Sequence, residues 1–82
     1  MRRRDAVLGT KNLIGARVEG KRKELGWKQK ELLAKLQING LELNASALSK
    51  LEGQIRSVTD LELLIIAETL EVSILWLLTG EE

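Results

Sequence analysis

Apolar side chains along this chain recur at intervals of three and four residues, with charged and polar residues between them. This spacing is typical of helices that bury one face. In one example, Leu32, Leu33 and Leu36 fall on one side of a helix whose other sides are charged. No segment shows the alternation of Val, Thr or aromatic residues that favours a strand. The pattern predicts an all-α protein with five helices, over residues 12–25, 29–36 or slightly beyond, 44–52, 60–70 and 74–79.

Preferred N-capping residues stand ahead of four of these helices. They are Asn12, Asn44, Thr59 and Ser73. Thr59 and Glu62 have the spacing of a capping box, and Gly26 can end the first helix in the left-handed conformation. Gly15 and Gly20 each weaken the first helix by about 1 kcal/mol relative to Ala. The first helix therefore depends on packing against the rest of the protein.

The last two expected helices are apolar on nearly every side. The residues concerned are Leu61, Leu63, Leu64, Ile65, Ile66, Ala67 and Leu70, followed by residues 74–78. Such helices are buried on two sides, and the second side is either another core contact or a partner subunit. Apolar patches exposed on a monomer favour a symmetric homodimer through these C-terminal helices. Core filling alone explains the pattern nearly as well.

Length and composition agree with one small helical domain. A chain of 82 residues buries only a modest core, and its lack of Pro favours helix. The longest apolar runs, residues 63–67 and 74–78, are far shorter than the roughly 20 residues that span a bilayer, so we expect no membrane association. Without Cys there is no disulfide or thiolate metal site. The opening Met-Arg-Arg-Arg is not followed by the apolar stretch of a signal peptide, so we expect a cytoplasmic protein.

The formal net charge of +1 conceals a strong asymmetry along the chain. Residues 1–35 hold eleven Lys/Arg and four Asp/Glu, a net charge of +7, whereas residues 36–82 hold two and eight, a net charge of −6. This asymmetry suits a protein whose N-terminal half approaches a polyanion, although uneven solvation alone also produces it. Residues 2–4, all Arg, lie in an expected flexible basic arm over residues 1–11.

Three segments stand out by the order and spacing of their residues. They are Gln29-x-x-Leu32-x-x-x-Leu36, Asn44-x-x-x-Leu48-Ser49-Lys50-Leu51-Glu52 and the Val-Ser-Ile-Leu-Trp-Leu-Leu of residues 72–78. Together they resemble the Cro and lambda-repressor (Xre-type) helix-turn-helix family. The resemblance implies a compact five-helix, lambda-repressor-like DNA-binding domain over residues 12–80, with the motif at 29–52.

The same resemblance implies a function. It is sequence-specific binding of double-stranded DNA by a transcriptional regulator, with repression as the expected effect, in a prokaryotic cell or encoded by a phage. The recognition helix, residues 44–52, would enter the major groove with the geometry of phage repressors. Ala45, Ser46 and Lys50 would then face base edges, which Lys and Ser hydrogen-bond and Ala touches at a thymine methyl. Because none of the three is Arg, Asn or Gln, we expect modest specificity per half-site, raised by dimerisation.

Phosphate contacts are implied for the residues around those three. They are Lys28, Gln29, Asn44, Ser49 and Arg56. In relatives the Gln at the position of Gln29 also braces the first residues of the recognition helix. Lys28 replaces a family Ser or Thr cap, and contact with a phosphate would offset that loss. Arg56 is equally consistent with a solvated charge.

The resemblance further implies a partly buried structural ion pair between Arg22 and Glu52, which fixes the recognition helix against the first helix. Removing either partner would strand a charge; two unrelated surface charges are the alternative.

Two features depart from the family pattern. The turn over residues 37–43 is longer than in most relatives, and we expect it to form an ordered bulge that buries Ile38, Leu41 and Leu43. After the motif, Gly53 comes one position before the family Gly and Gln54 takes that position, so we expect an irregular helix end.

Two other classes of function compete with the DNA-binding hypothesis. The alternative is a helical protein–protein interaction module, antitoxin- or adaptor-like, with weak DNA affinity. A net charge near zero and a weak set of base-reading residues support it. An enzyme is disfavoured, because the sequence has no His or Cys, no glycine-rich phosphate loop and no recognisable pair of carboxylates. We therefore expect no catalytic residues, no metal and no cofactor.

Overall fold

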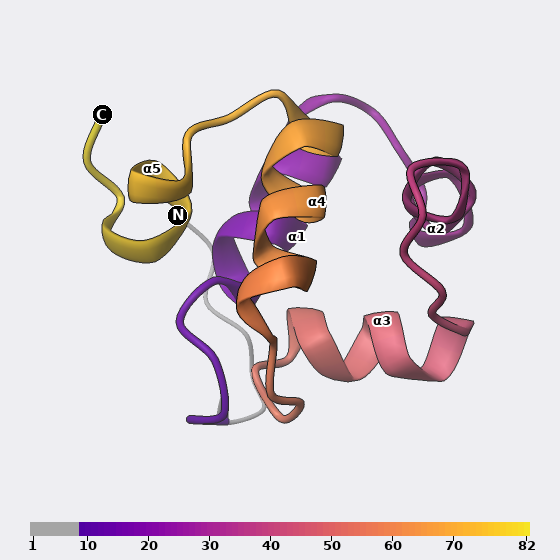
Figure 1. Cartoon of the computed structure of the whole chain (residues 1–82), viewed down its shortest axis with the longest axis horizontal. Coiled ribbons are helices and arrows are strands. Elements are labelled where there is room, and N and C mark those ends of the chain that lie inside the picture. Colours follow the sequence, from indigo (N-terminus) through magenta and orange to yellow (C-terminus); the bar gives the residue numbers. More distant parts are fainter. Residues whose placement is uncertain (1–8) are drawn as a thin grey trace.

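The computed structural model describes residues 9–82 and is built from helices (Figure 1). The helices are α1 Gly15–Glu24, α2 Gln29–Ile38, α3 Ala45–Glu52, α4 Asp60–Leu70 and α5 Ile74–Thr79. The described residues contain no strand, so the predicted all-α class is confirmed. Most of the expected basic arm, residues 1–8, lies outside the described residues.

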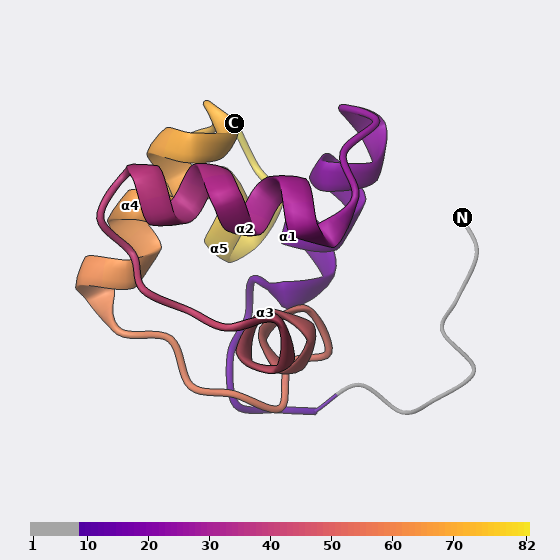
Figure 2. The ribbon, with the colours of Figure 1, turned by 90° about the vertical axis from the view of Figure 1, so that its right-hand side faces the viewer.

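The helices pack around one core. α1 lies beside α4, α2 and α3 lie together to one side of that pair, and α5 packs on α4 from the other side (Figure 1). A view from the side shows α3 below α1 and α2 (Figure 2). Every helix contributes fully buried apolar side chains, which are Val18, Leu32, Leu36, Leu48, Leu51, Ile66, Leu70 and Leu77. The position of α3 is therefore fixed by burial of its own leucines.

The expected caps are present at three helix starts. Asn44 Oδ1 accepts a hydrogen bond from Ala47 N at 2.7 Å, and Ser73 Oγ accepts one from Trp76 N at 2.9 Å. Thr59 and Glu62 form the predicted capping box at the start of α4. These contacts satisfy backbone N–H groups that the first turn of a helix leaves without a partner.

The expected start of the first helix is wrong. α1 begins at Gly15 with Ile14 at the N-cap position, three residues after the expected cap Asn12. Asn12 Oδ1 still accepts hydrogen bonds from the N–H groups of Ile14 and Gly15, at 3.0 and 2.8 Å. Its amide nitrogen is meanwhile used to bind another part of the chain, which keeps Asn12 outside the helix. The helix ends as expected, with Gly26 left-handed at φ +79°.

The long turn between α2 and α3 is ordered by polar contacts at both of its ends. α2 extends to Ile38, and Gly40 then adopts φ +97° while Leu41 N donates to Leu36 O at 2.9 Å. Further on, Gln37 Nε2 donates to Leu43 O at 3.0 Å. The turn thus closes back on the helix from which it leaves.

The apolar residues of this turn divide into two groups. Leu41 and Leu43 are buried, as expected, but Ile38 is 83% exposed, which contradicts the expectation that it turns inward. Ile38 is still part of α2, and its position in the last turn faces solvent. Asn39 Nδ2 donates to Thr69 Oγ1 at 2.8 Å, which ties the turn to α4.

The apolar C-terminal helices are only partly covered. Ile66, Ala67 and Leu70 face the core from α4, whereas exposed large apolar side chains remain on the outer sides of α4 and α5. These are Leu61, Leu64, Ile74, Leu75 and Leu78. Within residues 9–82, none of the helices combines the length and apolar character needed to cross a bilayer.

Candidate nucleic-acid interface

α3 has one buried face and one exposed face. Leu48, Leu51 and Glu52 are buried, in keeping with the three- and four-residue spacing of one helix side. The exposed residues are Asn44, Ala45, Ser46, Ser49 and Lys50, which are all five residues expected at DNA on this helix. Apart from Lys50 their side chains are short. The outer face of α3 therefore allows the helix backbone to approach a grooved partner closely.

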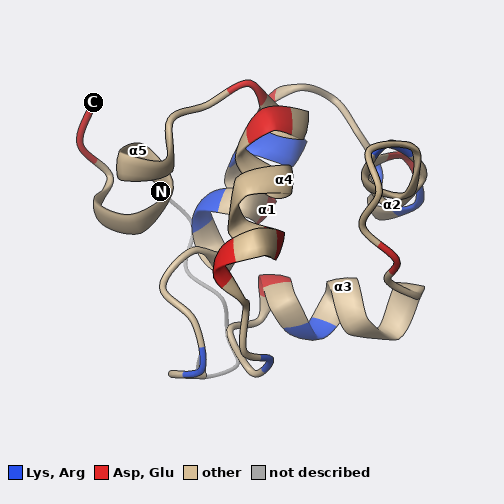
Figure 3. Ribbon diagram, in the orientation of Figure 1, with Lys and Arg blue, Asp and Glu red and all other residues tan. Residues whose placement is uncertain are grey.

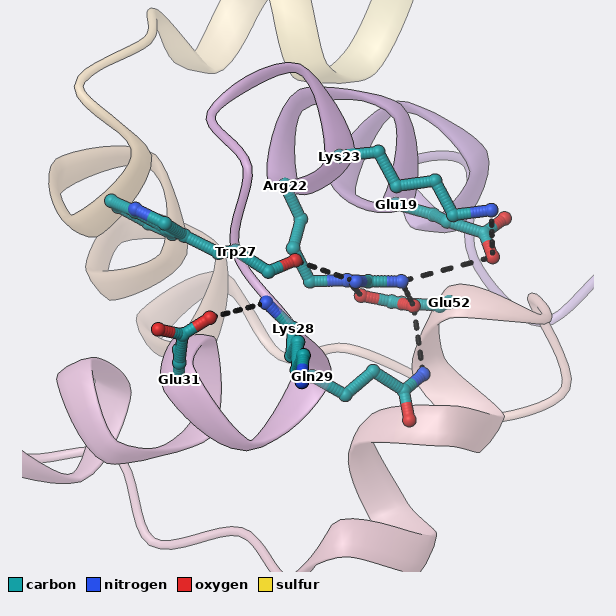
Figure 4. Close-up of polar contacts among 8 residues, drawn as sticks. All are labelled: Glu19, Arg22, Lys23, Trp27, Lys28, Gln29, Glu31 and Glu52. Atoms are coloured by element: carbon teal, nitrogen blue, oxygen red, sulfur yellow. Dashed lines mark hydrogen bonds and ion pairs between the residues drawn. The ribbon is translucent and has the colours of Figure 1, made fainter.

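The C-terminal end of α3 is held by the ion pair that the resemblance implied (Figure 4). Arg22 Nε donates to Glu52 Oε2 at 2.8 Å, and Arg22 Nη2 donates to Glu52 Oε1 at 3.1 Å. Glu52 has no exposed surface, and Arg22 is 7% exposed. The remaining donor Arg22 Nη1 binds Trp27 O at 2.8 Å. Two parallel charge-assisted hydrogen bonds fix both the distance and the orientation of α3 against α1.

Gln29 also belongs to this cluster. Its Nε2 donates to Glu52 Oε1 at 2.9 Å, and in Figure 4 its side chain extends toward Glu52. Gln29 thus braces the last residue of α3, whereas the resemblance implied a contact with its first residues. Its amide nitrogen serves a structural contact because a buried carboxylate needs more than one donor.

At the start of α2 a carboxylate takes the place of the missing side-chain cap. The Lys28 side chain makes no capping hydrogen bond, as expected from its chemistry. Instead the Glu31 carboxylate accepts a hydrogen bond from Lys28 N at 2.7 Å (Figure 4). Lys28 remains exposed, and its ammonium forms no ion pair with any residue between 9 and 82.

The segment ahead of α1 is bound to the segment that follows α3. Gly9 N donates to Gly53 O at 3.0 Å, and Lys11 N donates to Gln54 O at 2.9 Å. Asn12 Nδ2 donates to two carbonyl groups of the same region, Leu51 O at 3.1 Å and Arg56 O at 2.8 Å. Residues 9–11, which we expected within the flexible arm, are therefore held against the C-terminal end of α3.

Close backbone contact explains two unusual residues at this junction. A Cβ atom on Gly15 would lie 2.2 Å from Leu51 O, so only glycine allows α1 to approach the end of α3 this closely. Gln54 adopts the left-handed φ of +62°, whereas Gly53 has φ −82°. The helix end is thus irregular, as expected, and Gln54 Nε2 binds Asn12 O at 2.7 Å.

Arg56 lies in the loop after α3, but its guanidinium is paired within the protein. Its Nη1 and Nη2 donate to Glu62 Oε1 and Oε2, both at 3.0 Å. The hydrogen bonds with Glu62 raise the pKa of Arg56, and the hydrogen bonds from Arg56 lower the pKa of Glu62. Glu62 therefore neutralises the charge of Arg56 within the protein, and the phosphate contact of Arg56 stays a prediction.

The lower edge of the molecule in Figure 3, on the side that α3 forms, carries Lys and Arg positions but no acidic ones among the described residues. These cationic positions lie on α3, on the loop after it and on the segment before α1; other Lys and Arg positions lie higher, on α1 and α2, together with the acidic ones. The Lys35 ammonium on α2 lies over the Trp27 ring, 4.7 Å from the ring centroid. Residues 9–82 contain no cluster of three or more His, Cys, Asp or Glu that could hold a metal ion.

The sequence prediction missed residues that act through hydrogen bonds between distant segments. The clearest examples are Lys11, Asn12 and Gln54, which join the start of the described chain to the end of α3. Glu31 was detectable, since a Glu three residues after a helix start is part of the capping-box pattern.

Comparisons of the chain with known proteins give no family to which it can be assigned. No family model, no curated protein and no solved structure matches it. The functional assignment therefore depends on the arrangement of the chain's own residues.

Proposed function

We propose that this protein is a double-stranded DNA-binding transcriptional regulator of the lambda-repressor-like helix-turn-helix type, acting as a repressor. α3 is the recognition helix, and its outer face enters the major groove. The observation that carries the proposal is that α3 presents its exposed side chains on one face, while its opposite face is fixed by buried leucines and the Arg22–Glu52 pair. A rigid helix with a narrow polar face has the shape that a major groove admits.

Within this proposal the exposed residues of α3 divide into two roles. Ala45, Ser46 and Lys50 face base edges, where the Lys ammonium donates to guanine and the Ala methyl group contacts thymine. Asn44 and Ser49 lie nearer to phosphates. Asn44 keeps its amide nitrogen for this contact, because its Oδ1 is the acceptor that caps α3.

Lys28 supplies a further phosphate contact from the start of α2. It is exposed, and it stands at a helix end where backbone N–H groups and the helix dipole attract an anion. Gln29 and Arg56 act indirectly in this proposal, because their side chains bind the carboxylates of Glu52 and Glu62 within the protein. This division reduces the set of expected phosphate contacts from five to three residues.

A homodimer through α4 and α5 completes the proposal. Leu61 is 66% exposed and Leu75 is 51% exposed. Covering these side chains with a second copy removes apolar surface from water, which favours association. Two recognition helices in one dimer would raise the modest specificity of each half-site. Sedimentation equilibrium should give the dimer mass, and Leu75→Glu should shift it toward the monomer.

The same exposed leucines favour the second candidate, a protein–protein interaction module with weak DNA affinity. In that case α4 and α5 bind a different protein and the outer face of α3 has no ligand. The two candidates differ in salt dependence, because phosphate contacts release counterions and a protein interface does not.

Titration of the protein into labelled random-sequence duplex DNA at two salt concentrations tests the proposal. We expect binding that weakens steeply with salt and that Lys50→Glu abolishes without loss of helical content. Lys23→Glu serves as a matched control, since it makes the same charge change at an exposed position on α1, away from this face. A folded protein that fails to bind duplex DNA at low salt would contradict the proposal and favour the interaction module.

A further inference from the structure

Lys11 is a cation that the sequence alone assigned to the arm and that the structure attaches to α3. Its N–H donates to Gln54 O at 2.9 Å, two residues beyond the last residue of α3. The neighbouring Asn12 binds Leu51 O and Arg56 O, so the segment crosses both the end of the helix and the loop after it. The backbone of Lys11 therefore has a fixed position relative to α3.

This position lies on the outer side of α3. In Figure 1 and Figure 2 the segment before α1 and the loop after α3 lie side by side and reach below α3, on the side away from α1 and α4. A helix lying in a major groove is flanked by the phosphate backbones. Groups placed just beyond the end of the helix on its outer side face one of those backbones.

Lys50, in the last turn of α3, faces base edges in the proposal; in the two segments just beyond the helix, residues 9–14 and 53–59, the cations are Lys11 and Arg56, and Lys11 is the one with a free charge. Arg56 is bound by Glu62 through two hydrogen bonds of 3.0 Å. Lys11 is exposed and forms no ion pair with any residue in the range 9–82. A free ammonium group on a flexible stem, held by an anchored backbone, is suited to contact a phosphate as a point charge.

We propose that Lys11 is the phosphate-contacting residue at the C-terminal end of α3, in the role that the sequence suggested for Arg56. This inference rests on the proposed DNA-binding function and adds a residue to it. The hydrogen bonds of Gly9, Lys11 and Asn12 to the α3 end position this contact, so that it is made only when α3 lies in the groove.

The test compares salt dependence among variants of the full chain. Binding of a random-sequence 20-base-pair duplex is measured by fluorescence anisotropy from low to moderate salt for wild type, Lys11→Gln, Arg56→Gln and Lys23→Gln. Lys23→Gln is the matched control, because Lys23 is 63% exposed on α1 and lies 3.6 Å from Glu19. It removes the same formal charge from a position away from the end of α3.

We expect Lys11→Gln to reduce the slope of log K against log salt by about 0.9, the value for one phosphate contact. Affinity should fall about equally for all duplex sequences, and Lys11→Arg should restore it. Arg56→Gln and Lys23→Gln should leave the slope within error of wild type. Far-ultraviolet circular dichroism confirms that each variant is folded.

Two other results would overturn the inference, and they are distinguishable. If wild type binds with a steep salt dependence but Lys11→Gln has the slope of Lys23→Gln, Lys11 makes no phosphate contact although the DNA-binding function stands. If folded wild type shows no salt-dependent binding, the proposed function fails and the role of Lys11 fails with it.

Discussion

The two ends of α3 are held by different kinds of interaction. At the C-terminal end, Glu52 is fully buried and bound by Arg22 and Gln29, and the segment before α1 is bound to the following loop. At the N-terminal end, the helix is preceded by a long turn and is held by the Asn44 cap and the burial of Leu43. A buried charge network specifies one geometry, whereas a cap and a leucine allow small adjustments.

This difference would suit the proposed docking of α3 in a groove. In that proposal the C-terminal end, which joins the rest of the domain, sets the angle of α3, and the N-terminal end adjusts to the DNA. Substitutions at the C-terminal end of α3 should therefore cost more unfolding free energy than substitutions at its N-terminal end.

The largest effect is expected from Arg22→Met. This substitution removes the Arg22 guanidinium from the buried Glu52 carboxylate, which costs about 3–5 kcal/mol of unfolding free energy. Urea unfolding followed by tryptophan fluorescence measures the loss. The double variant Arg22→Met, Glu52→Leu should recover most of it, because two apolar side chains need no charge compensation. A single variant within about 1 kcal/mol of wild type would show that this pair does not fix α3.

Two glycines of α1 should respond to alanine in opposite directions. Gly15→Ala places a Cβ atom 2.2 Å from Leu51 O and should destabilise the protein by about 1–3 kcal/mol, as overpacking does. Gly20→Ala meets nothing within 4 Å and should stabilise it by up to about 1 kcal/mol, because alanine has the higher helix propensity. Thermal unfolding of the pair tests this directly. Equal shifts for both variants would mean that α1 and α3 do not make close contact.

A smaller effect is expected at the N-terminal end of α3. Asn44→Ala removes the oxygen that accepts from Ala47 N and should cost about 1 kcal/mol. Ser46→Ala is the control on the same face, and its effect should stay within about 0.5 kcal/mol, as for most surface changes. Both are measured by urea unfolding. An Asn44→Ala loss as large as that of Arg22→Met would remove the difference between the two ends.

The smallest effect concerns pH and the pair formed by Arg56 and Glu62. The pKa of Glu62 is lower in the folded protein than its ordinary value of 4.5, so the pair stabilises the fold above that pH and the contribution is lost as the pH falls through the lowered pKa. Glu62→Gln should cost no more than about 1 kcal/mol at neutral pH, since the pair is partly exposed. The two proteins should converge in stability in strong acid. A difference that stays constant with pH would exclude this carboxylate as its cause.

The fold was predictable where short-range patterns determine the structure. The bounds of α4 and α5 follow from the Thr59 and Ser73 caps and the apolar runs after them, and both agree with the structure. The outer face of α3 follows from helix periodicity alone. The Arg22–Glu52 pair came from the positions of both residues in a family pattern, which carries three-dimensional information that spacing within one chain lacks.

The errors share a different cause, namely competition between partners that are distant in the sequence. Asn12 has the chemistry of a cap, but its amide also reaches Leu51 O and Arg56 O, so α1 begins later than expected. Arg56 was predicted to contact phosphate or to be a solvated charge, and its pairing with a carboxylate six residues later was not foreseen. These pairings depend on which donors and acceptors the fold brings together, and this information cannot be read from a single sequence.

The most direct test of the central claim, that the outer face of α3 is the nucleic-acid interface, is amide chemical-shift mapping by nuclear magnetic resonance during titration with duplex DNA. We expect the largest chemical-shift changes at the amides of residues 44–50 and further changes at residues 28 and 11. The amide signals of α4 and α5 should not shift. Saturable binding whose shifts are confined to α4 and α5 would contradict the claim, because the ligand would then occupy the apolar face and leave α3 free.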